Sequence, residues 1–180
     1  MKFKENESFF EIETSMEHDK KPIAISYANA IISKGRYYTN LKDDIMIREY
    51  NALGEKFLIS DKISDSIEDW KLTKEMKMID DFLCYKAIKQ KTIENSLKTT
   101  NFDIVAWYCP QLPARFGPKD YNNLPGLILE LKDTHFTFYV EKIQILNKEE
   151  VKLERLKGET ISKKEFQKKM LGVSGQIIKN

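Results

Sequence analysis

The sequence predicts a mainly β protein: a single curved antiparallel sheet of about nine or ten strands, bowl-like or half-barrel, with a short C-terminal helix. Apolar and polar residues alternate over many short segments, which is the pattern of half-buried strands. The turns between these segments are too short to hold crossover helices, so the strands are expected to pair antiparallel. A length of 180 residues fits one domain. We expect a sheet core over residues 1–148 and an extension over residues 149–180.

Five strands are expected in the first half of the chain. The alternation places them at residues 3–12, 36–41, 45–50, 54–60 and 70–78. Lys42, Asp43 and Asp44 are typical of a turn between the second and third strands. The segment 23–33 fits either a helix or a strand, and Gly35 ends it in both cases.

The second half of the chain continues the same sheet. Residues 81–89 and 102–109 are expected to pair as a hairpin around a polar loop. The mostly apolar run 126–131 predicts a central strand. Strands over residues 136–140 and 142–146 would complete the sheet.

A helix is expected near residues 162–171. Ser162 followed by Glu165 is a capping-box pattern, which marks the start of a helix. The apolar residues that follow share one helical face: Phe166, Met170 and Leu171.

Composition excludes several classes of function. The formal net charge is only +2, from 30 Lys+Arg and 28 Asp+Glu, so we expect no nucleic-acid partner. No run of 18 apolar residues occurs, so we expect no transmembrane segment. The first residues form no apolar signal segment, which predicts a cytoplasmic protein if the sequence is the full gene product.

The residues that usually carry catalysis or bind metals are scattered. His18 and His135 are far apart, and each is more typical of a solvated surface than of a metal site. The adjacent carboxylates Asp80 and Asp81 would point to opposite faces of a strand, so they could not act on one substrate atom. No glycine-rich phosphate loop is present. We therefore expect no catalytic residue, no metal and no cofactor.

The two cysteines occupy related places in the expected hairpin. A symmetric register makes the numbers of facing residues sum to 193, and 84 + 109 = 193, so Cys84 would face Cys109. A disulfide is one interpretation, since a facing pair needs little adjustment to reach disulfide geometry. Two buried free thiols that pack as small apolar residues are the other. A disulfide would indicate a protein outside the cytoplasm.

A loop rich in proline and glycine joins the hairpin to the central strand. Proline limits φ and removes amide donors, so such a loop has few conformations. A rigid crossover that closes one end of the sheet is the simpler interpretation, and a loop that binds a ligand or partner is the alternative. The residues that define this motif loop are Trp107, Pro110, Pro113, Gly117, Pro118, Tyr121, Leu124, Pro125, Gly126, Leu127 and Ile128.

The motif loop resembles that of the GLPGLI family, named for a six-residue motif. Here the motif reads Asn123-Leu124-Pro125-Gly126-Leu127-Ile128. Asn123 replaces the first glycine and is one of the few other residues that tolerate a left-handed backbone. The segment 81–87 looks like the family's Cys-x-Lys-Ala strand, and the resemblance covers roughly residues 3–146.

The resemblance implies an uncharacterised protein of the bacterial envelope, periplasmic or secreted, with no established catalytic residue. It also implies a curved antiparallel sheet; a similar bowl-like domain accompanies some bacterial N-glycan-cleaving amidases as a non-catalytic part. The sequence departs from the family at its N-terminus, where the usual signal peptide and a further strand are missing. An exposed edge near the Phe3 strand, and self-association through it, would follow.

These observations predict a non-enzymatic extracytoplasmic β domain that binds an apolar, lipid-like ligand or an envelope protein on its curved sheet. A structural or assembly module of the envelope without a small ligand is the second hypothesis. A hydrolase with an unrecognised site is the third. The aromatic residues expected to line the sheet face, or to form its core, are Phe57, Trp70, Phe82, Trp107, Phe136 and Phe138.

Overall fold

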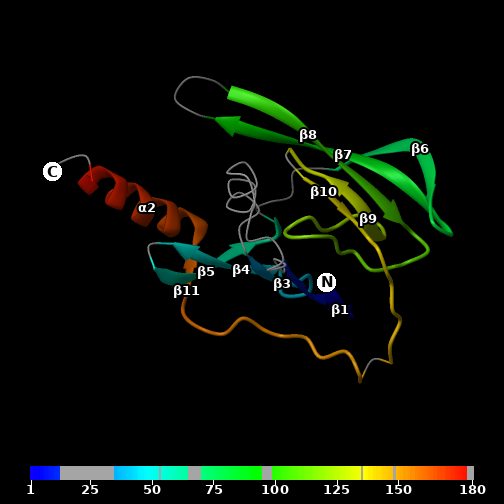
Figure 1. Cartoon of the computed structure of the whole chain (residues 1–180), viewed down its shortest axis with the longest axis horizontal. Coiled ribbons are helices and arrows are strands. Elements are labelled where there is room, and N and C mark those ends of the chain that lie inside the picture. Colours follow the sequence, from blue (N-terminus) through cyan, green and yellow to red (C-terminus); the bar gives the residue numbers. More distant parts are fainter. Residues whose placement is uncertain are drawn as a thin grey trace, which may run out of the picture. The chain divides into compact units, whose positions relative to one another are not determined.

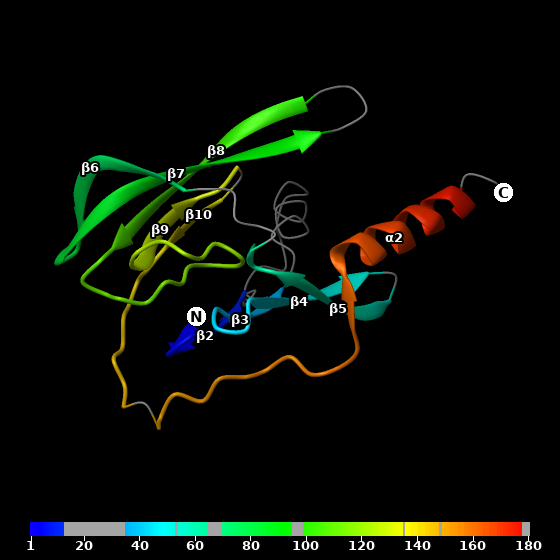
Figure 2. The same cartoon turned by 180° about the vertical axis from the view of Figure 1, so that it is seen from behind.

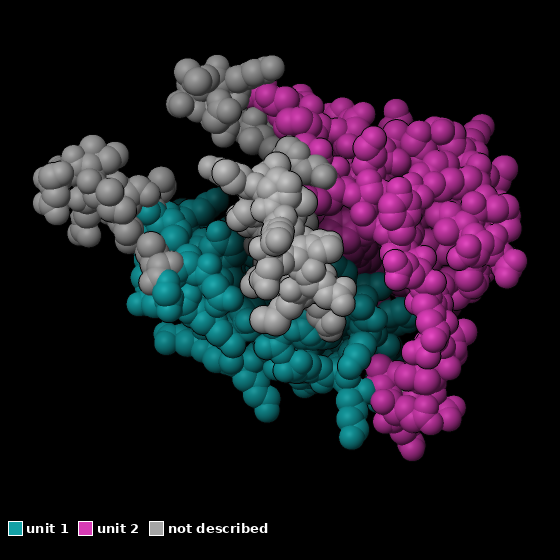
Figure 3. All heavy atoms as spheres, viewed as in Figure 1, with its two compact units in different colours: residues 1–65, 152–180 teal, residues 66–151 magenta. Residues whose placement is uncertain are grey.

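The computed structural model describes residues 1–12, 35–52, 54–64, 70–94, 99–134, 136–147 and 149–177 (Figure 1). The chain divides into two compact units, shown in two colours in Figure 3. Unit 1 comprises residues 1–65 and 152–180, and unit 2 comprises residues 66–151. Each unit has its own sheet, one of six strands and one of five. The mainly β class is confirmed, but the expectation of a single sheet is wrong, because alternation identifies strands without showing which sheet each one joins.

The sheet of unit 1 has the strand order β1-β2-β3-β4-β5-β11. Its strands are β1 (Lys2–Lys4), β2 (Glu7–Glu11), β3 (Arg36–Asn40), β4 (Ile45–Ala52), β5 (Glu55–Lys62) and β11 (Thr160–Ser162). All pairs are antiparallel except β11 with β5, which is parallel and aligns Thr160 with Leu58. The expectation of a purely antiparallel sheet is therefore also wrong, because a strand that returns from far along the chain can pair in either direction.

The expected turn between β3 and β4 is confirmed. Asn40 accepts hydrogen bonds through its side-chain oxygen from the backbone amides of Lys42 (3.0 Å) and Asp43 (3.1 Å). Asp44 closes the turn with a left-handed φ of 54°. The segment 23–33 lies outside the described residues.

Apolar side chains pack on both faces of the six-stranded sheet. Phe9, Tyr38 and Leu58 are buried with Leu156, which comes from the connection that leads to β11. On the other face, Phe57 and Ile59 pack with Phe166 of helix α2 (Lys163–Ile177).

The helix begins where the capping box predicts. The backbone amide of Ser162 donates to Glu165 Oε2 (2.8 Å), and the amide of Glu165 donates to Ser162 Oγ (3.2 Å). The expected helix is thus confirmed, and it continues beyond residue 171, to Ile177.

The sheet of unit 2 has the order β10-β9-β8-β7-β6 and is antiparallel throughout (Figure 2). Its strands are β6 (Lys71–Ile79), β7 (Phe82–Glu94), β8 (Thr99–Cys109), β9 (Leu127–Lys132) and β10 (Thr137–Tyr139). The expected hairpin register is confirmed, because Tyr85 pairs with Tyr108 and Ala87 with Ala106. The expected strand at 142–146 is irregular instead, and Ile145 is 87% exposed, so its alternation belongs to a surface segment.

The core of unit 2 lies against one face of this sheet. Ala87, Ile104, Ala106 and Leu131 are completely buried on strands β7, β8 and β9. Tyr121 and Leu124 belong to the same cluster, and both come from the loop between β8 and β9. The motif loop therefore supplies part of the core rather than only connecting two strands.

Candidate functional site

The motif loop is held to the sheet by backbone hydrogen bonds. The amide of Leu127 donates to the carbonyl of Leu112 (2.9 Å), and the amide of Ile128 donates to the carbonyl of Phe116 (3.0 Å). Phe116 is fully buried and has the largest side chain among the fully buried residues described. These contacts fix the loop at both its middle and its end.

Asn123 has the left-handed backbone that its place in the motif predicts. Its φ is 72°, and its side-chain oxygen accepts a hydrogen bond from Arg115 Nη2 (2.9 Å). The amide of Asn123 donates to the carbonyl of Arg115 (3.1 Å). Asparagine thus replaces the motif's first glycine without loss of the turn.

Gly117 and Gly126 are needed for close approach. A Cβ on Gly117 would lie 2.5 Å from Ile128 Cδ1 and 2.6 Å from the carbonyl oxygen of Tyr121. A Cβ on Gly126 would overlap the carbonyl group of Cys109, with its carbon at 2.5 Å. Both positions therefore exclude any side chain while the loop keeps this path.

The prolines of the loop differ in exposure. Pro118 is buried, whereas Pro113 and Pro125 are exposed. Pro110 is exposed at the start of the loop, where it lines a pocket described below. The buried proline and the two glycines thus serve the shape of the loop, and only its first residues reach the candidate binding surface.

A buried carboxylate ties the loop to the end of β9. Asp133 Oδ1 accepts hydrogen bonds from the amide (2.6 Å) and hydroxyl (2.7 Å) of Thr134, and Lys91 Nζ lies 3.6 Å away. The Tyr121 hydroxyl also bonds to this carboxylate. Burial raises the pKa of Asp133, but the hydrogen bonds from Thr134 and the Lys91 charge outweigh it and leave the pKa below its usual range. These contacts give the cluster a structural role, since they hold the loop against the end of β9.

We expect Asp133→Asn to destabilise unit 2 at pH 7 by about 1–3 kcal/mol, because the hydrogen-bonded carboxylate loses its charge. A depressed carboxyl pKa stabilises the folded state above the unfolded value of about 3.9 and loses that effect as the pH falls through the folded value. The difference from the parent should therefore shrink towards zero at acid pH. Urea unfolding followed by tryptophan fluorescence measures this, because both tryptophans, Trp70 and Trp107, lie in unit 2. Asp103→Asn, at an exposed position, is the control; equal loss at pH 7 and at acid pH would contradict the argument.

Cys84 and Cys109 are present as two buried free thiols. Extending the confirmed register by one pair places them opposite each other, as expected, and the Cys84 thiol donates to the carbonyl oxygen of Phe82 (3.6 Å). Burial, and then the neighbouring Cys109, raise the pKa of Cys84 to about 11. The structure thus corresponds to the second of the two interpretations of the cysteine pair.

The aromatic residues expected to line one sheet face do not lie together. Phe57 belongs to unit 1, where its ring lies 5.3 Å from that of Phe166. Trp70 and Phe138 pack against the core of unit 2, and Trp70 Nε1 donates to the carbonyl of Asn122 (3.1 Å).

The other aromatic residues of that group take different places in unit 2. Phe136 is half-buried, 5.5 Å from Lys119 Nζ. Phe82 and Trp107 lie on the sheet face opposite to the core, as their alternation with Leu83 and Tyr108 requires. Of the six aromatic residues named from the sequence, Phe57 is buried and the other five are half-buried, and they form no common lining.

An exposed apolar strip runs along β6, one of the two outer strands of the unit 2 sheet. It consists of Leu72, Met76 and Met78, which are 52%, 58% and 59% exposed. Their cross-strand partners are Ala87, Tyr85 and Leu83, in that order, so all three lie on the core-side face of the sheet. Large apolar side chains this exposed and this close together are typical of a binding surface.

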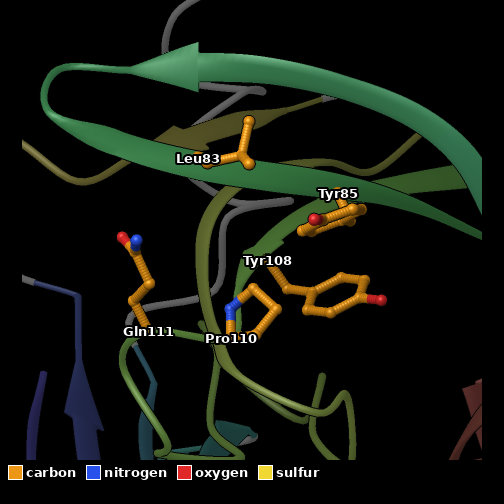
Figure 4. A pocket seen from close by; sticks show the side chains of 5 residues that line it. All are labelled: Leu83, Tyr85, Tyr108, Pro110 and Gln111. Atoms are coloured by element: carbon orange, nitrogen blue, oxygen red, sulfur yellow. The ribbon is translucent and has the colours of Figure 1, made fainter.

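A shallow pocket continues the strip on the neighbouring strands (Figure 4). Its volume is about 280 Å³, it is open to solvent, and it is lined by Leu83, Tyr85, Tyr108, Pro110 and Gln111. The rings of Tyr85 and Tyr108 lie 6.2 Å apart. Burial, with a smaller effect from Tyr85, raises the pKa of Tyr108, so its hydroxyl is protonated at neutral pH. We call these five residues the tyrosine pocket.

Lys71, Lys77 and Lys86 lie on the sheet face opposite to the apolar strip, and only some of the lysines of this edge are paired. Lys77 Nζ lies 2.5 Å from Glu130 Oε2, and Lys86 Nζ lies 2.9 Å from Glu75 Oε1. Lys71 and Lys74 are exposed and form no ion pair within the described parts of the chain. The start of β6, next to Leu72, therefore has an excess of positive charge.

Sequence reasoning missed this surface. Alternation placed Leu72, Met76 and Met78 on one face but could not show that the motif loop leaves that part of the face uncovered. Across the residues that the structure describes, no group of three or more His, Cys, Asp or Glu side chains is arranged to hold a metal ion. His18 and His135 lie outside the described residues. No described helix is long and apolar enough to span a bilayer.

The comparison with protein families finds one match. Residues 89–130 match a family described as a protein of unknown function (Porph_ging). The matched residues run from β7 through β8 and the motif loop into β9, and they include Tyr108, Pro110 and Gln111 of the tyrosine pocket. No curated protein and no solved structure matches the chain.

Proposed function

We propose that unit 2 is a non-enzymatic binding module for an extended segment of a partner polypeptide. The segment would lie along the apolar strip of β6 and place a side chain in the tyrosine pocket. The exposure of Leu72, Met76 and Met78 beside that pocket is the observation that supports the proposal most directly. Flexible methionine side chains suit a surface that adapts to a bound chain.

The size of the pocket favours a polypeptide over a lipid. Pockets that enclose a drug-sized molecule usually measure about 300–1,000 Å³ and bury most of its surface. The tyrosine pocket, at about 280 Å³ and open to solvent, can accept one or two side chains but cannot enclose an acyl chain. A partner segment would gain its remaining contacts from the strip.

Charge and backbone both constrain the partner. Lys71 and Lys74 favour acidic residues beside the apolar ones. The register of β6 with β7 shifts between Leu72 and Met76, and such a bulge weakens pairing on an outer strand. Backbone pairing would therefore be confined to residues 76–79, and side-chain contacts would supply the rest of the affinity. The partner segment is an alternation of apolar and acidic residues.

An extracytoplasmic location is part of the proposal. It rests on the resemblance of the motif loop and of residues 81–87 to the GLPGLI family, for which a place in the bacterial envelope is implied. The match of residues 89–130 to a family of unknown function supports the resemblance over that stretch. The partner would then be another protein of the envelope.

A seven-residue synthetic peptide of alternating valine and glutamate, labelled with a fluorophore, tests the proposal. We expect the full chain to bind it with a dissociation constant of about 100 μM or tighter, measured by fluorescence anisotropy. Met76→Lys with Met78→Lys should weaken binding at least about tenfold, because each methionine buries apolar area worth about 1.5–3 kcal/mol. A peptide with lysine in place of glutamate should bind more weakly than the acidic one.

Ile145→Lys with Leu146→Lys is the matched control, since it changes two exposed apolar residues of unit 2 outside the strip. It should leave binding unchanged. Equal affinity of the parent and the Met76→Lys, Met78→Lys variant would overturn the proposal. So would binding to phosphatidylglycerol vesicles without binding to the peptide. Self-association seen by light scattering and abolished by the two lysines would assign the strip to a second copy of the chain instead.

A further inference from the structure

The cysteine pair occupies the strand positions next to the tyrosine pocket. Cys84 precedes Tyr85 on β7, and Cys109 follows Tyr108 on β8. The tyrosines point to the core-side face of the sheet, so the cysteines point to the opposite face. Both thiols are completely buried, and the Cys84 thiol donates to the carbonyl oxygen of Phe82 (3.6 Å).

This arrangement is close to that of a cross-strand disulfide. Facing residues of an antiparallel pair have Cβ atoms about 4.5–5.5 Å apart, whereas a disulfide needs about 3.5–4.5 Å. An approach of about 1 Å between two strands is therefore sufficient. The pairing of β7 with β8 ends at Tyr85 with Tyr108, directly before the two cysteines, so their approach does not require this register to change.

We propose that Cys84 and Cys109 are a redox pair that closes to an intramolecular disulfide and thereby fixes the pocket end of the β7–β8 hairpin. The inference does not depend on the partner segment proposed above. It concerns the chemistry of unit 2 itself, and its test uses no peptide.

The reaction needs a disulfide oxidant, for which oxidised glutathione serves. The thiolate of one cysteine attacks a sulfur of oxidised glutathione, forms a mixed disulfide and releases one glutathione thiolate. The thiolate of the other cysteine then attacks the protein sulfur of the mixed disulfide and releases the second glutathione. In sum, two protein thiols lose two electrons and two protons, and oxidised glutathione becomes two molecules of glutathione.

The charges around Cys84 set the pH at which this reaction is fast. Lys77 on β6 favours the thiolate, whereas Glu130 on β9 and Cys109 on β8 disfavour it. Burial dominates, and the pKa of Cys84 is about 11. Since the thiolate fraction rises about tenfold per pH unit below the pKa, oxidation of the folded chain should accelerate from pH 7 to pH 9.

The experiment starts from the full chain reduced with dithiothreitol and then freed of it. Incubation with oxidised glutathione at pH 8.5 should lower the mass measured under denaturing conditions by about 2 Da, with no glutathione retained. Peptide mapping without reduction should join the peptides that contain Cys84 and Cys109. The urea midpoint of tryptophan fluorescence should rise by about 1 M or more, because the bond closes a loop of the unfolded chain.

Cys84→Ala and Cys109→Ala are the matched variants. Each should show no loss of 2 Da and no rise of the urea midpoint after the same treatment. A parent chain that keeps both thiols, while the urea-unfolded chain oxidises under the same conditions, would overturn the inference. A covalent dimer, or an oxidised form with a lower urea midpoint, would overturn it as well.

Discussion

Replacing Gly126 by alanine should destabilise unit 2 by about 3 kcal/mol or more. A Cβ at this position would overlap the carbonyl group of Cys109 and lie 2.8 Å from the nitrogen of Pro110. Both contacts are with backbone, which cannot turn aside as the end of a flexible side chain can. Either β8 or the end of the motif loop would have to move, and each is fixed by the strand pairing around Tyr108 and Ile128.

The measurement is the urea midpoint of Gly126→Ala followed by tryptophan fluorescence, which reports unit 2. Pro125→Ala is the control, because it changes the neighbouring residue at an exposed position and should cost less than about 1 kcal/mol. Gly54→Ala in unit 1, followed by circular dichroism, adds a second comparison. Gly54 has a φ of 77°, but a Cβ added there would have no heavy atom within 4 Å, so this variant isolates backbone strain from steric overlap. A Gly126→Ala variant as stable as its parent would show that the loop can follow another path.

The strands were predictable because local chemistry determines them. Alternation placed residues 36–41, 45–50 and 70–78 in strands, and the structure has β3, β4 and β6 there. The symmetric register expected for the hairpin, in which facing residue numbers sum to 193, places Tyr85 opposite Tyr108 and is confirmed. Asn123 was expected to tolerate a left-handed backbone, and it has one, because that preference depends on the residue alone.

The assignment of strands to sheets was not predictable in the same way. β11 has only three residues, and its pairing with β5 joins positions about 100 residues apart in the sequence. Phe57 and Phe138 were both expected on one sheet face, yet they belong to different units. Alternation describes the two faces of a strand but not the neighbour that covers either face.

The candidate site could not be predicted for the same reason: the sequence does not show which strand faces remain uncovered. Nothing in the residues of β6 distinguishes Met76 and Met78, which are exposed, from apolar residues that a loop covers. That difference depends on how much of the core-side face of the sheet the motif loop covers. The hydrogen bonds of Leu127 with Leu112 and of Ile128 with Phe116 determine this path, and they join residues that only the folded chain brings together.

Phe116→Ala should therefore affect both stability and binding. Phe116 is completely buried, and truncation of such a side chain costs about 3–5 kcal/mol. A unit of this size has a total stability of about 5–10 kcal/mol, so the variant should be folded but marginal. Phe116→Leu keeps most of the apolar volume and should cost less than about 1.5 kcal/mol.

Comparing Phe116→Leu with the Met76→Lys, Met78→Lys variant also tests whether binding depends on the position of the loop or only on the apolar strip. Pro110 and Gln111 line the tyrosine pocket and belong to the same loop as Phe116, whereas Met76 and Met78 belong to β6. Under conditions in which Phe116→Leu is folded, a loosened loop should weaken binding of the valine–glutamate peptide even though no residue in contact with the peptide has changed. The Met76→Lys, Met78→Lys variant should do the reverse, with binding lost and the urea midpoint kept. If Phe116→Leu lowers the midpoint but leaves the peptide affinity unchanged, the loop does not contribute to the binding surface, and the strip alone would have to account for it.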